Sequence, residues 1–108
     1  MTEVVASTDL LCVRPDGESV RVSAALGRPY QTSAGDWACP VALSGIHDSL
    51  SDAHGVDSLQ ALCLAATLLR ELLARELERG CKLLYQNGGE EFPLDATFSA
   101  VGGSKDSV

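Results

Sequence analysis

Apolar and polar residues alternate along the first half of the chain, a pattern that is typical of β-strands. Residues 19–26 carry an apolar side chain at every second position: Val20, Val22, Ala24 and Leu26. Residues 3–13 are rich in β-formers, and the intervening Arg14-Pro15-Asp16-Gly17 has the composition of a tight turn. These segments predict a β-hairpin.

A second alternating segment covers residues 37–45 and places four apolar side chains on one face: Trp37, Cys39, Val41 and Leu43. Pro40 lacks an N–H group, which predicts that this strand lies at the edge of a sheet. Glycine, proline and polar residues on either side, at 27–36 and 46–56, predict loops.

The longest predicted element is a helix over residues 57–79. Asp57 is a good N-cap, Gln60 completes a capping-box pattern, and Gly80 is a good stop. After it, residues 81–86 predict a strand and residues 87–89 a turn, and alternation over 90–100 predicts a further strand. The fold class is therefore α+β: an antiparallel β meander packed against one long helix, with a short C-terminal β segment. Residues 1–100 are predicted to form one domain, and residues 101–108 a disordered tail.

The predicted helix carries two apolar stripes about 120° apart. The first consists of Leu59, Leu62, Ala66, Leu69, Leu73 and Leu77, and the second of Ala61, Leu64, Ala65, Leu68 and Leu72. A helix on one face of a sheet needs only one stripe, so the second must be covered by the C-terminal segment, by a second copy, or by another protein. We expect this second row to be an interaction surface, in a homodimer or a partner complex.

Charge narrows the classes of partner. Of 108 residues, 15 are acidic and 8 basic, which gives a net charge of −7. Nucleic acids and anionic membranes attract basic surfaces, so neither is an expected partner. No apolar run reaches the roughly 18–20 residues that span a bilayer, and the N-terminus does not resemble a secretory signal. We therefore expect a cytoplasmic protein.

The four cysteines, Cys12, Cys39, Cys63 and Cys81, form no C-x-x-C pair, so no metal site of the usual spacing is predicted. Each lies in an apolar stretch and is interpreted as a buried, reduced thiol, although a disulfide stays open as an alternative.

Three other groups of residues could carry chemistry, but each has a simpler interpretation. The loop cluster His47, Asp48, Asp52, His54 and Asp57 contains metal-ligand types but matches no familiar spacing. Cys39 with His47 and Asp48 has the residue types of a thiol nucleophile with its base, yet Cys39 lies on an apolar strand face. Gly88-Gly89 follows Asn87 and is typical of a hairpin turn. We predict no catalytic residue, no metal site and no cofactor, and hence not an enzyme.

Residues 55–62, GVDSLQAL, resemble the serine motif of acyl and peptidyl carrier proteins. That resemblance implies a phosphopantetheine arm on Ser58. Carrier proteins are all-helical, whereas the segments on both sides of this motif are strand-like, so Ser58 is interpreted as a residue of the helix cap. The carrier stays the alternative function.

Three motifs in order resemble a family of small bacterial domains that is catalogued only as a domain of unknown function. They are W-x-C-P at 37–40, G-V-D-S-L-Q-A-L-x-L-A at 55–65 and G-G-x-x-F-P at 88–93. The resemblance spans roughly residues 19–95 and implies a single α+β domain of bacterial origin, with no activity attached. Together with charge and size, it leads to the hypothesis of a protein that acts by binding another protein, for example as an immunity- or antitoxin-like neutraliser of a basic toxin.

Overall fold

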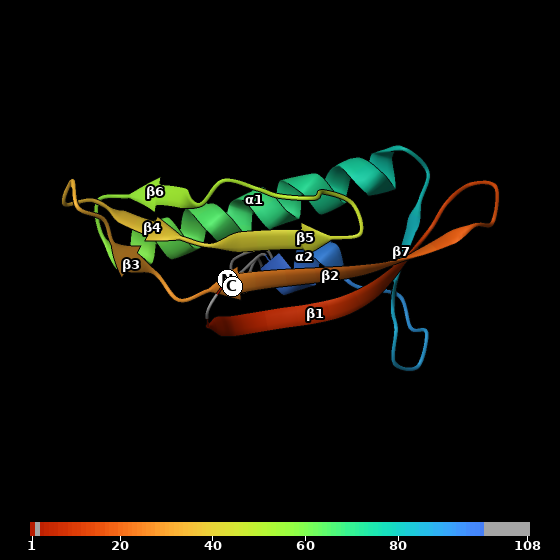
Figure 1. Cartoon of the computed structure of the whole chain (residues 1–108). Coiled ribbons are helices and arrows are strands. Elements are labelled where there is room, and N and C mark those ends of the chain that lie inside the picture. The colour runs from red at the N-terminus through yellow and green to blue at the C-terminus, as the bar shows by residue number, and fades with distance from the viewer. Residues whose placement is uncertain (2, 99–108) are drawn as a thin grey trace, which may run out of the picture.

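Two antiparallel sheets share one long helix in the computed structural model, which describes residues 1 and 3–98 (Figure 1). The four-stranded sheet has the order β5-β2-β1-β7, and the three-stranded sheet the order β3-β4-β6. The predicted α+β class is confirmed. The tail predicted for residues 101–108 lies outside the described residues.

The large sheet is built on the predicted hairpin, β1 (Val4–Val13) with β2 (Ser19–Gly27). The Arg14 amide donates to the Glu18 carbonyl at 2.7 Å, which closes the hairpin at the predicted turn. The strand β5 (Val41–Ser44) pairs with β2, and β7 (Lys82–Tyr85) pairs with β1. Apolar residues of alternate positions on these strands, such as Leu10, Val22, Leu43 and Leu83, meet in the core.

The small sheet contains two strands that the sequence did not predict, β3 (Tyr30–Gln31) and β6 (Ala53–Gly55), on either side of β4 (Trp37–Cys39). Pro40 separates β4 from β5, so the single strand predicted over 37–45 is divided between the two sheets. The prediction of an edge strand is confirmed for β5, the outer strand of the large sheet, but it was wrong for β4, which is the central strand of the small sheet.

The long helix α1 (Ser58–Glu78) begins and ends where its caps predict. Asp57 accepts from the Gln60 amide at 2.8 Å, and the Gln60 side chain accepts from the Val56 amide at 2.7 Å. At the other end, Gly80 has a φ of +92°, which favours glycine, and its amide donates to the Leu77 carbonyl.

The buried face of α1 lies between the two predicted stripes and takes residues from both. Its buried residues are Ala61, Ala65, Leu69, Leu72, Leu73 and Glu76. The expectation that the sheet covers one stripe alone was therefore wrong, because strands of both sheets pack against the helix. The polar side of the helix, which includes Gln60 and Glu71, is exposed.

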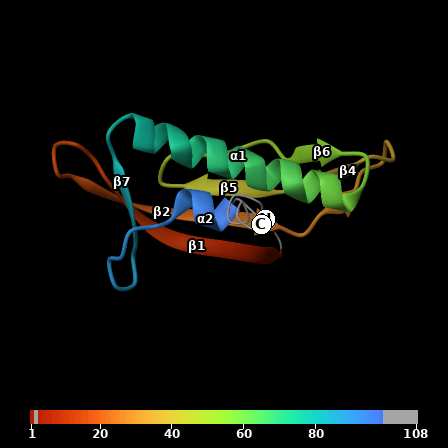
Figure 2. The same cartoon turned by 180° about the vertical axis from the view of Figure 1, so that it is seen from behind.

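The segment after β7 differs from its prediction, since residues 94–98 form a short helix, α2 (Leu94–Phe98), and not a strand. Leu94 and Phe98 are four residues apart, a spacing that fits one face of a helix as well as strand alternation. The Pro93 carbonyl accepts from the Thr97 amide at 2.9 Å and starts the turn. The C-terminal β structure is β7 itself, with a single bridge from Leu84 to Glu91. Seen from behind, α2 lies on the same side of the large sheet as α1 (Figure 2).

Candidate functional site

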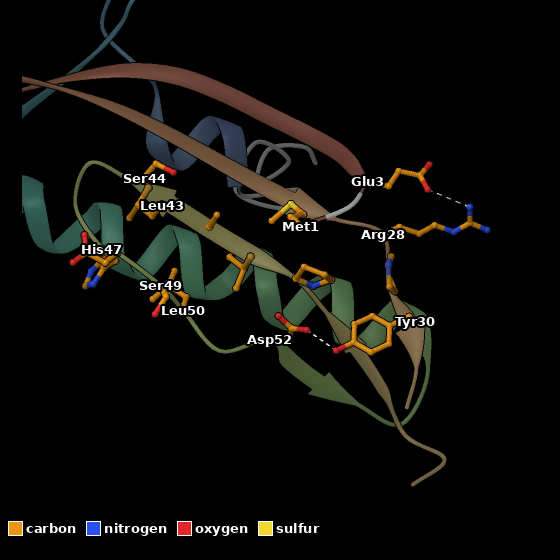
Figure 3. A pocket seen from close by; sticks show the side chains of 15 residues that line it. Met1, Glu3, Arg28, Tyr30, Leu43, Ser44, His47, Ser49, Leu50 and Asp52 are labelled. Atoms are coloured by element: carbon orange, nitrogen blue, oxygen red, sulfur yellow. Dashed lines mark hydrogen bonds and ion pairs between the residues drawn. The ribbon is translucent and has the colours of Figure 1, made fainter. Parts of the chain in front are cut away.

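A cleft of about 560 Å³ runs along the strand β5 (Figure 3). All four residues of β5 line it, including the inward-facing Val41 and Leu43 and the outward-facing Ala42 and Ser44. Since residues of both faces reach the cleft, it follows the free edge of the strand. The other side is lined by the returning loop that contains Ser49, Leu50 and Asp52, together with Tyr30 and Pro29.

The pairing of β5 with β2 determines which backbone groups face this cleft. The Gly27 amide donates to the Pro40 carbonyl at 2.9 Å, and hydrogen-bonded pairs recur at every second residue of an antiparallel ladder. Ala42 and Ser44 therefore bond to β2, whereas the amide and carbonyl groups of Val41 and Leu43 point away from it. In agreement, the Leu43 carbonyl accepts from the His47 amide at 3.0 Å. The Val41 amide and carbonyl and the Leu43 amide therefore lie on the edge of β5 that no other strand covers, in two residues that are buried within the chain.

Acidic side chains outnumber basic ones around the cleft. Glu3, Asp48 and Asp52 line it, against Arg28 and the imidazole of His47. Tyr30 Oη donates to Asp52 Oδ2 at 2.6 Å across the opening, and this hydrogen bond raises the pKa of Tyr30 (Figure 3). Arg28 Nη1 lies 3.5 Å from Glu3 Oε1, with both side chains largely exposed. The cleft therefore places hydrogen-bond acceptors and negative charge beside the edge of β5.

The five residues of the loop cluster considered for metal binding make contacts in different parts of the structure. Only His47, Asp48 and Asp52 of its five members line the cleft. Asp57 caps α1, and His54 Nδ1 lies 2.9 Å from Asp36 Oδ2. Within residues 1 and 3–98, these side chains form no group of three ligand atoms close enough to hold one ion.

The thiol of Cys39 does not join His47 and Asp48 at the cleft. Cys39 is fully buried, its Sγ donates to the Gly27 carbonyl at 3.3 Å, and burial raises the pKa of its thiol. A thiol held in this way is a poor nucleophile. Gly88 and Gly89 lie in the turn after β7, where the Gly89 amide donates to the Tyr85 carbonyl.

Ser58 is the first residue of α1 and is exposed. Its neighbour Asp57 supplies the N-cap, as the capping interpretation requires. The α+β fold around it differs from the all-helical architecture of carrier proteins.

The predicted interaction row does not form one surface. Ala61, Ala65 and Leu72 are buried in the core of the single chain, which corrects the expectation that these three are available to a partner. Of the other two, Leu64 is 44% exposed and Leu68 is partly buried against the core. The expected intrachain cover is present in part, since Leu83, Phe92 and Leu94 belong to the same core cluster as Leu72.

A second group, which sequence reasoning missed, brings together Cys12 from β1, Glu76 from α1 and Cys81 from the loop before β7. Their ligand atoms all lie within 4.8 Å of one another, and all three residues are buried. Burial raises the pKa of Cys12 to about 11, with the Cys81 thiol and the Glu76 carboxylate as further causes. Cys63, in contrast, is exposed, so the expectation of four buried thiols was wrong for this residue.

One part of this group could have been found from the sequence. Glu76 and Cys81 lie on either side of Gly80 at spacings that a glycine-terminated helix brings into contact. The approach of Cys12 depends on the register between β1 and β7, for which no local signal exists.

The fold and the cleft together define a small α+β domain that presents a free strand edge in an acidic cleft. The chain belongs to the family described as "Domain of unknown function (DUF6968)", whose profile matches residues 9–96. No curated protein and no solved structure matches the chain. In the part of the chain that the structure describes, neither helix has the length and hydrophobicity to cross a membrane.

Proposed function

We propose that this domain binds another protein by receiving an extended segment of it along the free edge of β5. The observation that carries the proposal is the cleft along β5, the outer strand of the large sheet, whose Val41 and Leu43 amides point away from β2. An added strand hydrogen-bonds to such an edge through its own backbone, and neighbouring side chains select its sequence. The role requires no covalent chemistry, so the domain acts as a binding protein and not as an enzyme.

The length of β5 limits the segment that fits. Four residues span about 14 Å at roughly 3.4 Å per residue. The returning loop already uses the Leu43 carbonyl, so the far end of the edge is closed by the turn at Ile46 and His47. A segment of about four or five residues therefore fits between this turn and Tyr30.

Charge indicates the chemistry of the partner. Glu3, Asp48 and Asp52 line the cleft and the whole chain has a net charge of −7, so a basic segment is favoured over an acidic one. A bacterial neutraliser that covers the basic surface of a toxin in the cytoplasm is one protein of this kind.

The test uses a short labelled peptide of alternating lysine and valine, with binding followed by fluorescence anisotropy. We expect it to bind, an equivalent glutamate–valine peptide to fail, and added salt to weaken the complex. Asp48→Lys should lower affinity by up to about fivefold, since a rim charge contributes up to about 1 kcal/mol. Glu78→Lys makes the same charge change on the polar side of α1 and is the matched control.

N-methylated peptides separate strand addition from simple charge attraction. A strand pairs through one edge only, so methylating one alternate set of peptide amides should abolish binding, whereas methylating the other set should leave it. Equal effects of the two sets would contradict the proposal.

Light scattering on the chain alone tests whether a second copy of the chain, and not a partner segment, binds along the edge of β5. The proposal predicts the monomer mass of 11.3 kDa and a one-to-one peptide complex. Twice that mass, with the peptide unable to bind, would assign the edge to a homodimer and overturn the proposal.

A further inference from the structure

We propose that Cys12, Glu76 and Cys81 bind a thiophilic divalent cation, with Zn²⁺ as the expected ion. The three residues come from β1, from the last turn of α1 and from the loop that follows it. Two thiolates and one carboxylate suit Zn²⁺ better than the oxygen-preferring Mg²⁺ or Ca²⁺.

The end of α1 places two of the ligands. The Cys81 amide donates to the Glu76 carbonyl at 3.0 Å, and the Gly80 amide donates to the Leu77 carbonyl at 3.0 Å. This pair of bonds is the Schellman arrangement, in which the two residues at the positions of Glu76 and Cys81 usually make an apolar contact. Here Cys81 Sγ lies 3.8 Å from Glu76 Oε1, so two metal-ligand types occupy the place of that contact.

The distances approach those of a tetrahedral centre. Zinc–sulfur bonds of about 2.3 Å and zinc–oxygen bonds of about 2.0–2.2 Å separate neighbouring ligand atoms by roughly 3.5–3.8 Å. All three ligand atoms already lie within 4.8 Å of one another. Side-chain adjustment of about 1 Å or less therefore completes the geometry.

The register between β1 and β7 disfavours a disulfide between the same cysteines. Cys12 is paired with Leu83, and Cys81, which directly precedes β7, is two residues away from that partner, so an extension of the ladder places it diagonally from Cys12. Diagonal neighbours are about 7–8 Å apart, whereas a disulfide needs Cα atoms within about 7 Å. An ion that keeps the two sulfurs almost 4 Å apart fits the diagonal better than a direct bond of about 2 Å.

Arg79 orients the Glu76 carboxylate and balances the charge of the proposed site. Glu76 is only 5% exposed, yet its second oxygen, Oε2, accepts from Arg79 Nη1 at 2.8 Å. The arginine thus fixes the carboxylate with Oε1 toward Cys81, as outer-sphere partners of metal ligands do. Two thiolates, one carboxylate and a divalent ion sum to −1, which Arg79 neutralises.

A cavity of about 330 Å³ gives access to the site. It is lined by Arg14, Pro15, Asp16, Glu76, Arg79 and Cys81. Two of the three ligands border it, with Cys12 behind them. An ion can therefore enter from solvent, and its fourth position remains available to water or an anion.

The test is a titration of the full-length, reduced, chelator-treated chain with Co²⁺ alone, followed by absorbance. We expect one ion per chain, thiolate-to-cobalt charge-transfer bands, the intense visible bands of a tetrahedral centre, and displacement by Zn²⁺. Cys12→Ser and Cys81→Ser should lose the charge-transfer bands, whereas the matched control Cys63→Ser, in an exposed thiol outside the group, should keep them.

Arg79→Gln tests the site without disturbing the core, since the Arg79 side chain is 70% exposed. It should lower affinity for Co²⁺ about 10–100-fold, and Arg75→Gln should leave affinity unchanged. Absence of charge-transfer bands in the folded, reduced wild type would overturn the proposal, as would their persistence in both Cys12→Ser and Cys81→Ser. A thiol count two short before reduction, restored by reductant, would assign the pair to a disulfide and equally overturn it.

Discussion

The two halves of α1 bury different kinds of side chain. In the first half, residues 58–67, the buried residues are Ala61 and Ala65, while Leu59 is 68% exposed. In the second half, residues 68–78, the buried residues are Leu69, Leu72, Leu73 and Glu76. The helix therefore contributes little apolar volume to the core at its start and most of it toward its end.

The close approach of the β6 backbone to α1 explains why the buried residues of the first half are small. A Cβ added at Gly55 of β6 would lie 2.6 Å from the Ala61 amide nitrogen, so only glycine fits at this position and the strand backbone lies directly against the first turns of the helix. In the second half, the core instead contains the bulkier side chains of Leu83, Phe92 and Leu94. The comparison teaches that the second half supplies stability and holds the buried thiol group, whereas the first half leaves apolar surface in solvent.

The two halves of α1 should differ most in how far an introduced charge lowers the free energy of unfolding. Leu72→Glu puts an unpaired carboxylate in the core and should lower the free energy of unfolding by about 3–5 kcal/mol. Leu64→Glu, on an exposed position, should change it by about 0.5 kcal/mol or less. Urea denaturation followed by circular dichroism measures both, and similar losses would mean that the two halves do not differ.

Thiol reactivity should distinguish the exposed cysteine on the first half of α1 from the three buried cysteines of the chain. Cys63, in the first half, should react quickly with a thiol reagent, while Cys12, Cys39 and Cys81 react slowly because they are buried. Burial also raises the pKa of Cys12 and of Cys39, which lowers their thiolate fraction at neutral pH. All four should react in denaturant, and more than one fast thiol in the native chain would contradict the burial described.

A smaller effect on stability should come from the pH dependence of Asp36, next to the small sheet that packs beside the first half of α1. The hydrogen bond from Thr32, and then His54, lowers the pKa of Asp36 below its usual 3.8. A lowered pKa means that the ionised group stabilises the fold above about pH 3.8, and that this contribution disappears as pH falls through the native pKa. Acid unfolding curves of Asp36→Asn should lack this component, and those of Glu71→Gln should keep it. Identical curves for Asp36→Asn and the wild type would refute the assignment.

No change at all is expected at Ser58, where the first half begins. Incubation with coenzyme A and a broad phosphopantetheinyl transferase should leave the intact mass of the protein unaltered. Ser58 begins a capped helix in an α+β fold, whereas the serine of a carrier protein lies in a helical bundle. Addition of one phosphopantetheine that is lost in Ser58→Ala would establish the carrier function instead.

Local signals made the main elements predictable. The content of β-formers predicted β1, alternation predicted β2, and Asp57 with Gly80 bounded α1 to within a residue. The strands β3 and β6 are only two and three residues long, too short for any period to show. For residues 94–98 the same apolar spacing fitted a helix and a strand, and the turn begun at Pro93 decided between them.

The sites were less predictable because they depend on pairing between distant segments. The cleft exists because Pro40 ends β4 and turns the chain so that β5 joins the other sheet as its edge. The thiol group needs Cys12 beside Cys81, which only the register of β1 and β7 provides. Conversely, His54 and Asp57 are close to Asp52 in sequence but serve different contacts.

The measurement that tests the central claim most directly is amide hydrogen exchange by nuclear magnetic resonance, with and without the lysine–valine peptide. If an extended segment adds to β5, exchange should slow at Val41 and Leu43, whose amides lie on the edge that no strand covers, while Ala42 and Ser44, already bonded to β2, should change little. Protection confined to the exposed start of α1, around Leu59 and Leu64, with Val41 and Leu43 unaffected, would contradict the account.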